Sequence, residues 1–155
     1  MKLVVGIIFC LLLSVAVFSQ QASLIEEFGT LSCDEYLMRM DVSLLQASKD
    51  SSAKITVLIY EGKEPRYNVR KNTFDLALPA FGSAKAKFKS METYISMRKF
   101  PIDRVSFVNA GFRENFGVEI WLVPSGALPP EPTPTLKKIK YRRGKANGFC
   151  LHCCG

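Results

Sequence analysis

The residues best suited to chemistry stand near the end of the chain, in the run Cys150-Leu151-His152-Cys153-Cys154. Thiolates and imidazole are ligands that zinc and copper(I) prefer. Structural zinc sites usually take two spaced ligand pairs, and adjacent cysteines do not easily chelate one ion, so we expect no metal site and no cofactor. His152 is the only histidine, which leaves no Cys/His catalytic set on a rigid scaffold. We expect disulfides here, or a chain end without function, and no enzyme.

The first nineteen residues predict export. Lys2 is followed by an apolar run from Leu3 to Leu13 and then by Val17-Phe18-Ser19. A charged start, a short apolar core and small residues before the cut are the parts of a secretory signal peptide. The run is too short to span a bilayer as a stable helix. We expect cleavage after Ser19, which gives a periplasmic or extracellular protein. Before cleavage, the protein would contact the membrane only through this peptide. The alternative is a retained N-terminal anchor.

Export gives the remaining cysteines a role. Cys10 lies within the predicted signal peptide, so four cysteines remain after cleavage: Cys33, Cys150, Cys153 and Cys154. An even count in an oxidising compartment favours disulfides, with three possible pairings. A bridge from Cys33 to the tail would close a loop of more than a hundred residues. In the chain-entropy model such a loop stabilises the fold by up to about 4–5 kcal/mol.

The positive charge of the chain belongs to its tail. The net charge is +7, and residues 137–155 carry six basic side chains and no acidic one. Residues 20–136 carry 14 basic and 14 acidic side chains. The folded part therefore lacks the basic surface typical of nucleic-acid binders, and we expect no nucleic-acid partner. A short basic segment in an exported protein suits anionic lipid headgroups, wall polymers or an acidic protein face, and equally a solvated tail without a partner.

Two amphipathic helices are predicted to position the candidate residues. Ser32 and Glu35 form a capping box, so a helix begins after Ser32, and apolar residues at helical spacing continue to about Ala47. Ser83 is predicted to cap a second helix, which ends near Lys99 because a proline follows two residues later.

Three strands are predicted around these helices. Residues 54–60, KITVLIY, are almost wholly apolar and β-branched, as in a central strand buried on both faces. Residues 104–110 and 117–123 are predicted to pair as a hairpin through Gly111 and Asn115. A strand–helix–strand unit crosses over right-handed, which makes the first two strands parallel.

The intervening segments are predicted to be irregular. Residues 61–82 are rich in glycine, proline and asparagine and predict a long loop. Its cluster of Arg66, Arg70 and Lys71 suits an anionic ligand or a solvated surface. Residues 125–136 contain four prolines and predict a stiff, extended spacer rather than packed structure.

Together these elements predict an α+β fold. We expect a two-layer sandwich in which a small mixed sheet of three to four strands carries two helices on one face. Removing 19 of the 155 residues leaves 136, enough for one domain with a core. The expected organisation is a signal peptide (1–19), an N-terminal segment (20–30), the domain (31–124), a proline-rich linker (125–136) and a basic cysteine-containing tail (137–155).

Residues 94–122, YISMRKFPIDRVSFVNAGFRENFGVEIWL, carry a resemblance to a known family. They are similar to the C-terminal half of OmpA-like (OmpA/MotB C-terminal) domains. The predicted first helix and the strand at residues 54–60 also fall in the order of that family, so the resemblance covers about residues 31–123. The matching residues are Tyr94, Ile95, Ile102 and Arg104 before the last hairpin, and Asn115, Val118, Glu119 and Ile120 in the last strand.

The resemblance implies a peptidoglycan-binding domain, in which an Asp after the central strand and an Arg on the second helix hold the diaminopimelate of the stem peptide. A carboxylate and a guanidinium suit a ligand that carries an ammonium and carboxylates. At the matching positions this chain has Glu61 or Glu64, and Lys87 in place of the Arg. Lysine does not replace arginine conservatively at a bidentate site.

These expectations lead to two hypotheses about function. The first is an exported, non-enzymatic envelope protein that binds peptidoglycan, another cell-wall component or an envelope protein. The second is a secreted structural or interaction protein whose cysteine-containing tail forms disulfides.

Overall fold

The computed structural model describes residues 20–150. The predicted signal peptide and the residues His152, Cys153 and Cys154 lie outside the described residues. The elements in chain order are β1 (Ser23–Phe28), α2 (Cys33–Ser48), β2 (Lys54–Asn68), β3 (Thr73–Ala77), α3 (Ser83–Met97), a short 3₁₀ helix η1 (Ile102–Arg104), β4 (Val105–Asn115) and β5 (Gly117–Val123). Within residues 20–150, no helix is both long and apolar enough to cross a membrane.

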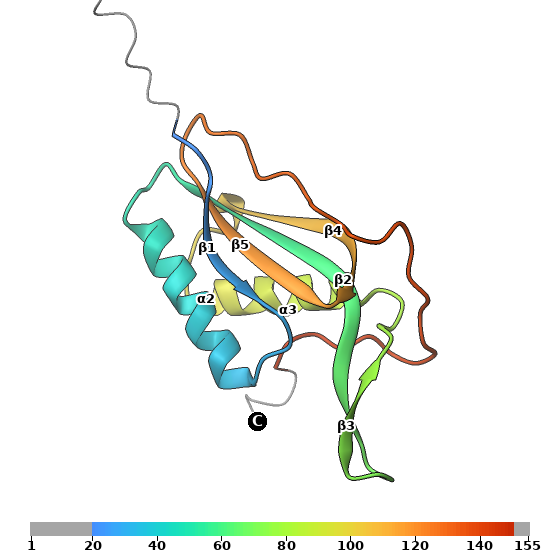
Figure 1. Cartoon of the computed structure of the whole chain (residues 1–155). Helices are drawn as coiled ribbons and strands as arrows, with labels where there is room; N and C mark the ends of the chain where they lie inside the picture. The colour runs from blue at the N-terminus through green and yellow to red at the C-terminus, as the bar shows by residue number, and fades with distance from the viewer. Residues whose placement is uncertain (1–19, 151–155) are drawn as a thin grey trace, which may run out of the picture.

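The central sheet has the strand order β1-β5-β2-β4 (Figure 1). β2 and β4 pair in parallel, as the crossover rule predicts, whereas β5 is antiparallel to both of its neighbours, β1 and β2. β3 pairs with the outer part of β2 and is the fifth strand. The sheet is therefore mixed, with five strands rather than three or four, and β1 lies in the N-terminal segment for which no element is predicted.

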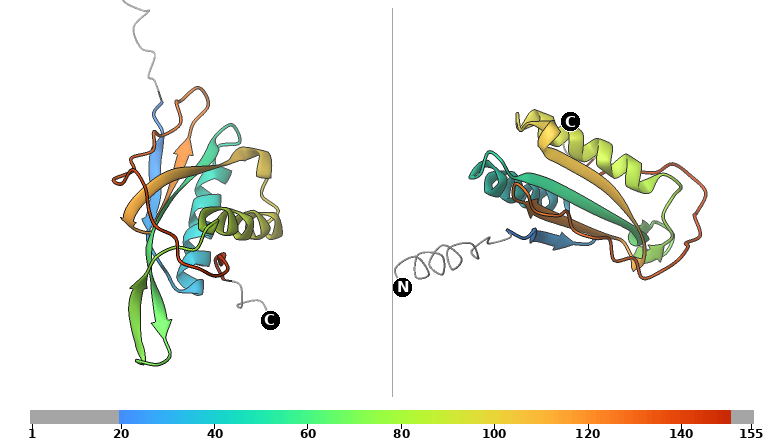
Figure 2. Two further views of the ribbon diagram at one scale, coloured as in Figure 1. Left: turned by 90° about the vertical axis from the view of Figure 1, so that its right-hand side faces the viewer. Right: turned by 90° about the horizontal axis from the view of Figure 1, so that it is seen from above.

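Both helices pack on one face of the sheet, as Figure 2 shows from above. Alternate residues of a strand point to opposite faces. On β2 the side chains of Ile55, Val57 and Ile59 point to the helices and are buried in one core with Met40 of α2 and Met91 of α3. The predicted α+β fold with two helices on a single face is confirmed.

The capping box predicted at Ser32 is present and explains where α2 begins. The Ser32 side chain accepts a hydrogen bond from the backbone of Glu35, and the Glu35 carboxylate accepts one from the backbone of Ser32. The buried side of this helix follows helical spacing through Tyr36, Met40, Leu44 and Ala47.

The predicted irregular loop is largely a hairpin, so this expectation is wrong. β2 continues to Asn68, the chain turns at residues 69–72, and β3 returns antiparallel to it. The pair forms an arm that projects from the sheet (Figure 1). A strand tolerates proline where it has no neighbour on one side, because proline has no backbone N–H to donate. In a two-stranded arm each strand has only one neighbour, so Pro65 does not break β2.

The predicted hairpin of the last two strands is also wrong, because β2 lies between β4 and β5. The chain leaves β4 at Asn115 and passes over β2 at Gly62 before it enters β5. A Cβ atom on Gly62 would lie 2.2 Å from the carbonyl carbon of Asn115, so this crossing requires glycine. Gly111, the expected turn residue, has φ 91° and lies inside β4, where the register with β2 shifts.

The proline-rich segment is extended but packs on the outer face of the sheet, opposite the helices, and is not the free spacer predicted. The backbone N–H of Thr133 donates to the Tyr60 hydroxyl (3.1 Å), and the Arg113 guanidinium donates to the Thr133 hydroxyl (2.7 Å). Leu136 N–H donates to the carbonyl of Phe112 (3.0 Å). These contacts cover Tyr60, which has no exposed surface and needs a partner for its hydroxyl.

Candidate functional site

Glu61, the first candidate carboxylate, is buried and belongs to the fold. Only 3% of its surface is exposed. One carboxylate oxygen accepts a hydrogen bond from the backbone N–H of Ala84 (3.0 Å), and the other accepts one from the hydroxyl of Tyr141 (2.6 Å). Burial, and then the neighbouring Glu61 carboxylate, raise the pKa of Tyr141 to about 12. Glu61 is therefore not placed to receive a ligand.

Glu61 also replaces the cap predicted for α3. Ser83 is the first residue of this helix and makes no cap, because the capping position is Gly82 in the left-handed conformation, φ 81°. A helix start leaves backbone N–H groups unpaired and carries partial positive charge. The Glu61 carboxylate from β2 meets both needs at Ala84.

The other two candidates, Glu64 and Lys87, form an ion pair. The Lys87 ammonium lies 3.0 Å from one oxygen of Glu64 and 3.3 Å from the other. Its side chain is 7% exposed, and the ammonium lies 4.4 Å and 4.9 Å from the ring centres of Phe116 and Phe149. Lys87 is thus enclosed beneath Glu64, which is 26% exposed and carries the accessible side of the pair.

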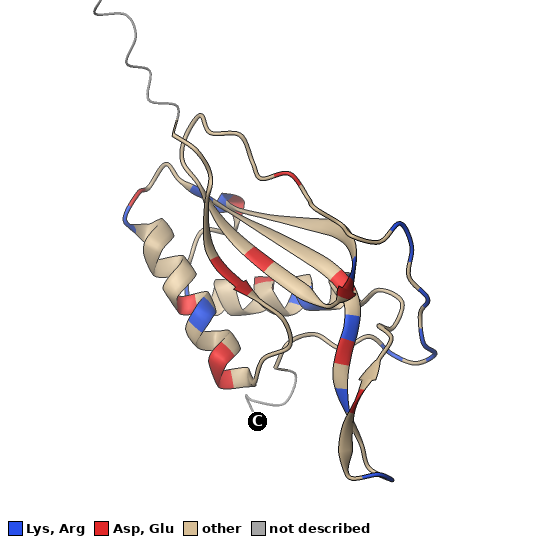
Figure 3. Cartoon of the chain, viewed as in Figure 1, with Lys and Arg blue, Asp and Glu red and all other residues tan. Residues whose placement is uncertain are grey.

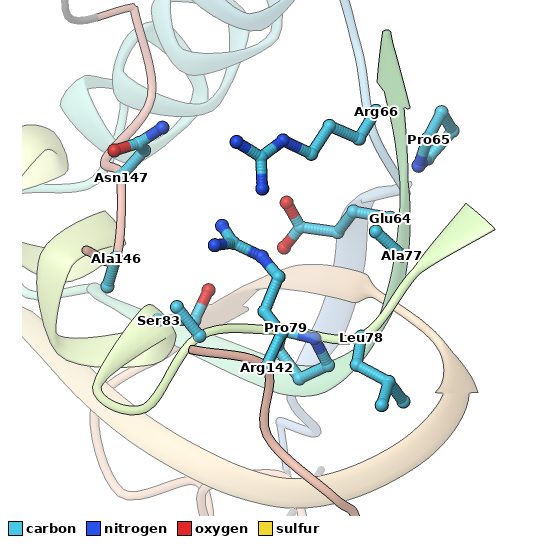
Figure 4. Close-up of a pocket in the computed structure, with 11 residues that line it drawn as sticks. Glu64, Pro65, Arg66, Ala77, Leu78, Pro79, Ser83, Arg142, Ala146 and Asn147 are labelled. Atoms are coloured by element: carbon cyan, nitrogen blue, oxygen red, sulfur yellow. The ribbon is translucent and has the colours of Figure 1, made fainter. Parts of the chain in front are cut away.

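Glu64 lines a cavity of about 140 Å³ at the base of the β2–β3 arm (Figure 4). The guanidinium groups of Arg66 and Arg142 point toward the Glu64 carboxylate, as Figure 4 shows, and Ser83 and Asn147 complete the polar lining. This volume gives the cavity room for a carboxylate or similar small group.

Charge decides which group suits this cavity. Lys87 already neutralises Glu64, so the guanidinium groups of Arg66 and Arg142 leave the cavity with two unbalanced positive charges. Guanidinium groups bind carboxylate and phosphate through paired hydrogen bonds. Glu64 beside them can accept from an ammonium. The site therefore suits a small anionic group, or one that carries both charges.

The basic tail supplies part of the cavity lining. Its backbone is held at the edge of the cavity by contacts with the chain after β3. Arg142 N–H donates to the carbonyl of Pro79 (2.9 Å), and Arg142 forms a β-bridge with Ala80. These contacts bring a residue from the basic tail beside Glu64 and Arg66 on β2. The site is thus assembled from segments about eighty residues apart in the chain.

A disulfide fixes the far end of this tail to the domain. Cys150 is bonded to Cys33 at the start of α2, one of the pairings that the cysteine count allows. Next to it, the ring of Phe149 stacks on Tyr36 with 4.4 Å between ring centres. Phe149 N–H donates to the Ser90 hydroxyl (2.8 Å). The tail is therefore packed against both helices up to the disulfide.

The structure thus brings Glu64 and Lys87 together as an ion pair, whereas Glu61 stabilises the start of α3 and takes no part in the cavity. Arg66 carries a sequence signal, since it belongs to the predicted basic cluster of the loop. Arg142 carries only the general signal of the basic tail, and Asn147 carries none, because the backbone pairing and the disulfide that place them join distant segments. Within residues 20–150 no group of three or more His, Cys, Asp or Glu side chains could hold a metal ion.

The comparisons with known proteins identify no relative. No protein-family model matches the sequence, and neither the curated proteins nor the solved structures give a significant match.

Proposed function

We propose that this protein is an exported, non-enzymatic envelope protein with a divergent OmpA-like domain that binds peptidoglycan through the cavity at Glu64. The observation that carries the proposal is the convergence of Arg66 and Arg142 on Glu64 around one small cavity. A wall peptide with free carboxylates and an ammonium has the charges that these three side chains complement.

The proposed site differs from the one that the resemblance implies. The resemblance places the guanidinium on the second helix, where this chain has Lys87, and that ammonium is enclosed and paired with Glu64. In the proposal, the guanidinium groups come instead from β2 and from the tail. The carboxylate of Glu64 is kept in place by Lys87 and accepts from the ligand ammonium through its exposed side.

Retention on purified peptidoglycan tests this proposal. We expect the chain from Gln20 to be retained, and Arg66→Ala and Arg142→Ala each to weaken retention by about tenfold, as for the loss of one charged hydrogen bond. Arg143→Ala is the matched control, because it removes the same charge from the exposed neighbour of Arg142. Retention no better than that of denatured protein, or variants indistinguishable from this control, would overturn the proposal.

A second candidate function rests on the cysteines. The Cys33–Cys150 disulfide supports a protein of an oxidising compartment. In this second candidate, the remaining tail cysteines link chains to one another. Non-reducing electrophoresis tests this. We expect a dimer band that disappears on reduction and in the double variant Cys153→Ser/Cys154→Ser. A monomer band alone in the oxidised wild-type chain contradicts it.

A further inference from the structure

The arm formed by β2 and β3 has one apolar face that nothing in residues 20–150 covers. Directly paired residues in antiparallel strands share a face. Pro65 pairs with Leu76 and Tyr67 with Phe74, so these four side chains lie together. Leu76, Tyr67 and Phe74 are 62%, 49% and 73% exposed, and the Tyr67 and Phe74 rings lie 5.4 Å apart.

The other face of the arm is polar, and its acidic side chains are already paired. It carries Glu64, Arg66 and Asn68 of β2 opposite Asp75 and Thr73 of β3. The Asp75 carboxylate accepts hydrogen bonds from Asn68 (2.8 Å), Lys71 (3.4 Å) and Thr73 (3.4 Å). Acidic side chains are therefore confined to this face, and the apolar face has none.

The end of the arm adds an aliphatic side chain and positive charge. Val69 is 81% exposed, and Arg70 and Lys71 follow it in the turn. The basic tail passes the base of the same arm, where Arg142 lines a cavity with Arg66. Figure 3 shows blue segments both at the end of the arm and along the tail beside it. The exposed apolar tip is thus accompanied by the two cations of its own turn, whereas Arg142 of the tail lies on the polar side of the arm.

We propose that this arm docks on an anionic lipid bilayer. The aromatic and aliphatic side chains of its apolar face would enter the boundary between headgroups and acyl chains, where tyrosine is favoured at the wet end and phenylalanine and leucine deeper. Arg70 and Lys71 in the turn at the end of the arm would meet the anionic headgroups. A projecting tip of apolar side chains next to cations suits a flat, negatively charged surface, and this contact is independent of the cavity at Glu64.

Vesicle co-sedimentation tests the proposal. The oxidised chain from Gln20 is mixed with phosphatidylcholine vesicles that contain or lack phosphatidylglycerol. We expect binding to the anionic vesicles, weakened by added salt, and at least about tenfold weaker binding for Tyr67→Ser/Phe74→Ser and for Arg70→Glu/Lys71→Glu. All four side chains are exposed, and an unchanged thermal melting curve verifies that the variants remain folded.

Matched controls change the same chemistry elsewhere. Met97→Ser/Leu128→Ser removes two exposed apolar side chains, and Lys49→Glu/Lys54→Glu reverses two exposed charges away from the arm. We expect both controls to bind as the wild-type chain does. A Val69→Trp variant should show blue-shifted tryptophan emission on the anionic vesicles.

Three results would overturn this proposal. The first is wild-type binding no stronger to anionic than to neutral vesicles. The second is arm variants that bind as tightly as the controls. The third is a wild-type dimer in solution that Tyr67→Ser/Phe74→Ser makes monomeric without any vesicle binding, because the apolar face would then be covered by a second copy.

Discussion

The carboxylate of Glu61 is buried between the start of α3 and the tail, and both of its oxygens accept hydrogen bonds. Its position just after the apolar run of β2 is the one at which the resemblance to OmpA-like domains implies a ligand-binding acid. The helix start beside it explains the difference. Because Gly82 offers no side chain, the N–H of Ala84 takes its partner from β2, and the charge is favourable at that end of the helix.

Removing this carboxylate should therefore reduce stability. In Glu61→Ala the N–H of Ala84 and the hydroxyl of Tyr141 lose their acceptor, and we expect the free energy of unfolding to fall by about 2–4 kcal/mol. Urea denaturation measures the change. The exposed residue Glu114 provides the control, since Glu114→Ala should change stability by less than about 0.5 kcal/mol. Equal effects of the two substitutions would contradict this assignment.

The hydroxyl of Tyr141 gives a pH dependence at the same contact. Burial and the Glu61 carboxylate raise its pKa from 10.0 to about 12 in the folded chain. Between these values the unfolded chain has lost the proton and the folded chain keeps it, so stability falls as pH rises from 10 to 12. We expect melting temperatures of the wild-type chain to fall more steeply over this range than those of Tyr141→Phe. Parallel curves would show that the contact does not form.

At the scale of elements, the crossing of the β4–β5 connection over β2 depends on a single glycine. A Cβ on Gly62 would lie 2.2 Å from the carbonyl carbon of Asn115 and 2.4 Å from the nitrogen of Phe116. Both atoms belong to the backbone, so a flexible side chain cannot relieve the contact.

We expect Gly62→Ala to destabilise the fold by more than about 3 kcal/mol or to prevent folding. Gly117→Ala is the matched control, because a Cβ there would have ordinary contacts at 3.8 Å and 3.9 Å, and its cost should stay within about 1 kcal/mol. Thermal unfolding followed by circular dichroism compares the two. Similar melting temperatures for both variants would contradict the tight crossing.

The same elements show what the sequence can predict. The capping box at Ser32 and the β-branched run of residues 54–60 act locally, so α2 and the first half of β2 are predictable. The strand β3, the edge strand β1 and the crossing at Gly62 depend on pairing between distant segments. Gly62 fits the composition of an irregular loop but is a site of close backbone approach inside β2, and single-sequence patterns do not separate these two uses of glycine.

At the scale of the whole molecule, the proline-rich segment and the basic tail add contacts to both layers of the domain. Residues 133–136 pack on the outer face of the sheet, and residues 141–150 pack against the helices and the base of the arm. Composition predicts a stiff spacer for the proline-rich residues 125–136 and, for the basic residues 137–155, either contact with an anionic partner or a solvated tail. Both segments pack through long-range contacts, which is also why the place of Arg142 beside Glu64 could not be predicted.

The Cys33–Cys150 disulfide should therefore control both stability and the cavity. It joins residues 117 apart, and loss of such a loop closure costs about 3–5 kcal/mol in the chain-entropy model. We expect the free energy of unfolding of Cys33→Ser/Cys150→Ser, measured by urea denaturation, to be lower by this amount. Because Arg142 is then less firmly held beside Glu64, we also expect this variant to be retained less on peptidoglycan. Cys153→Ser/Cys154→Ser is the control and should match the wild-type chain in both measurements. If the first variant loses stability but keeps full retention at a temperature where it is folded, the pairing of Arg142 with Pro79 and Ala80 alone is sufficient to assemble the cavity.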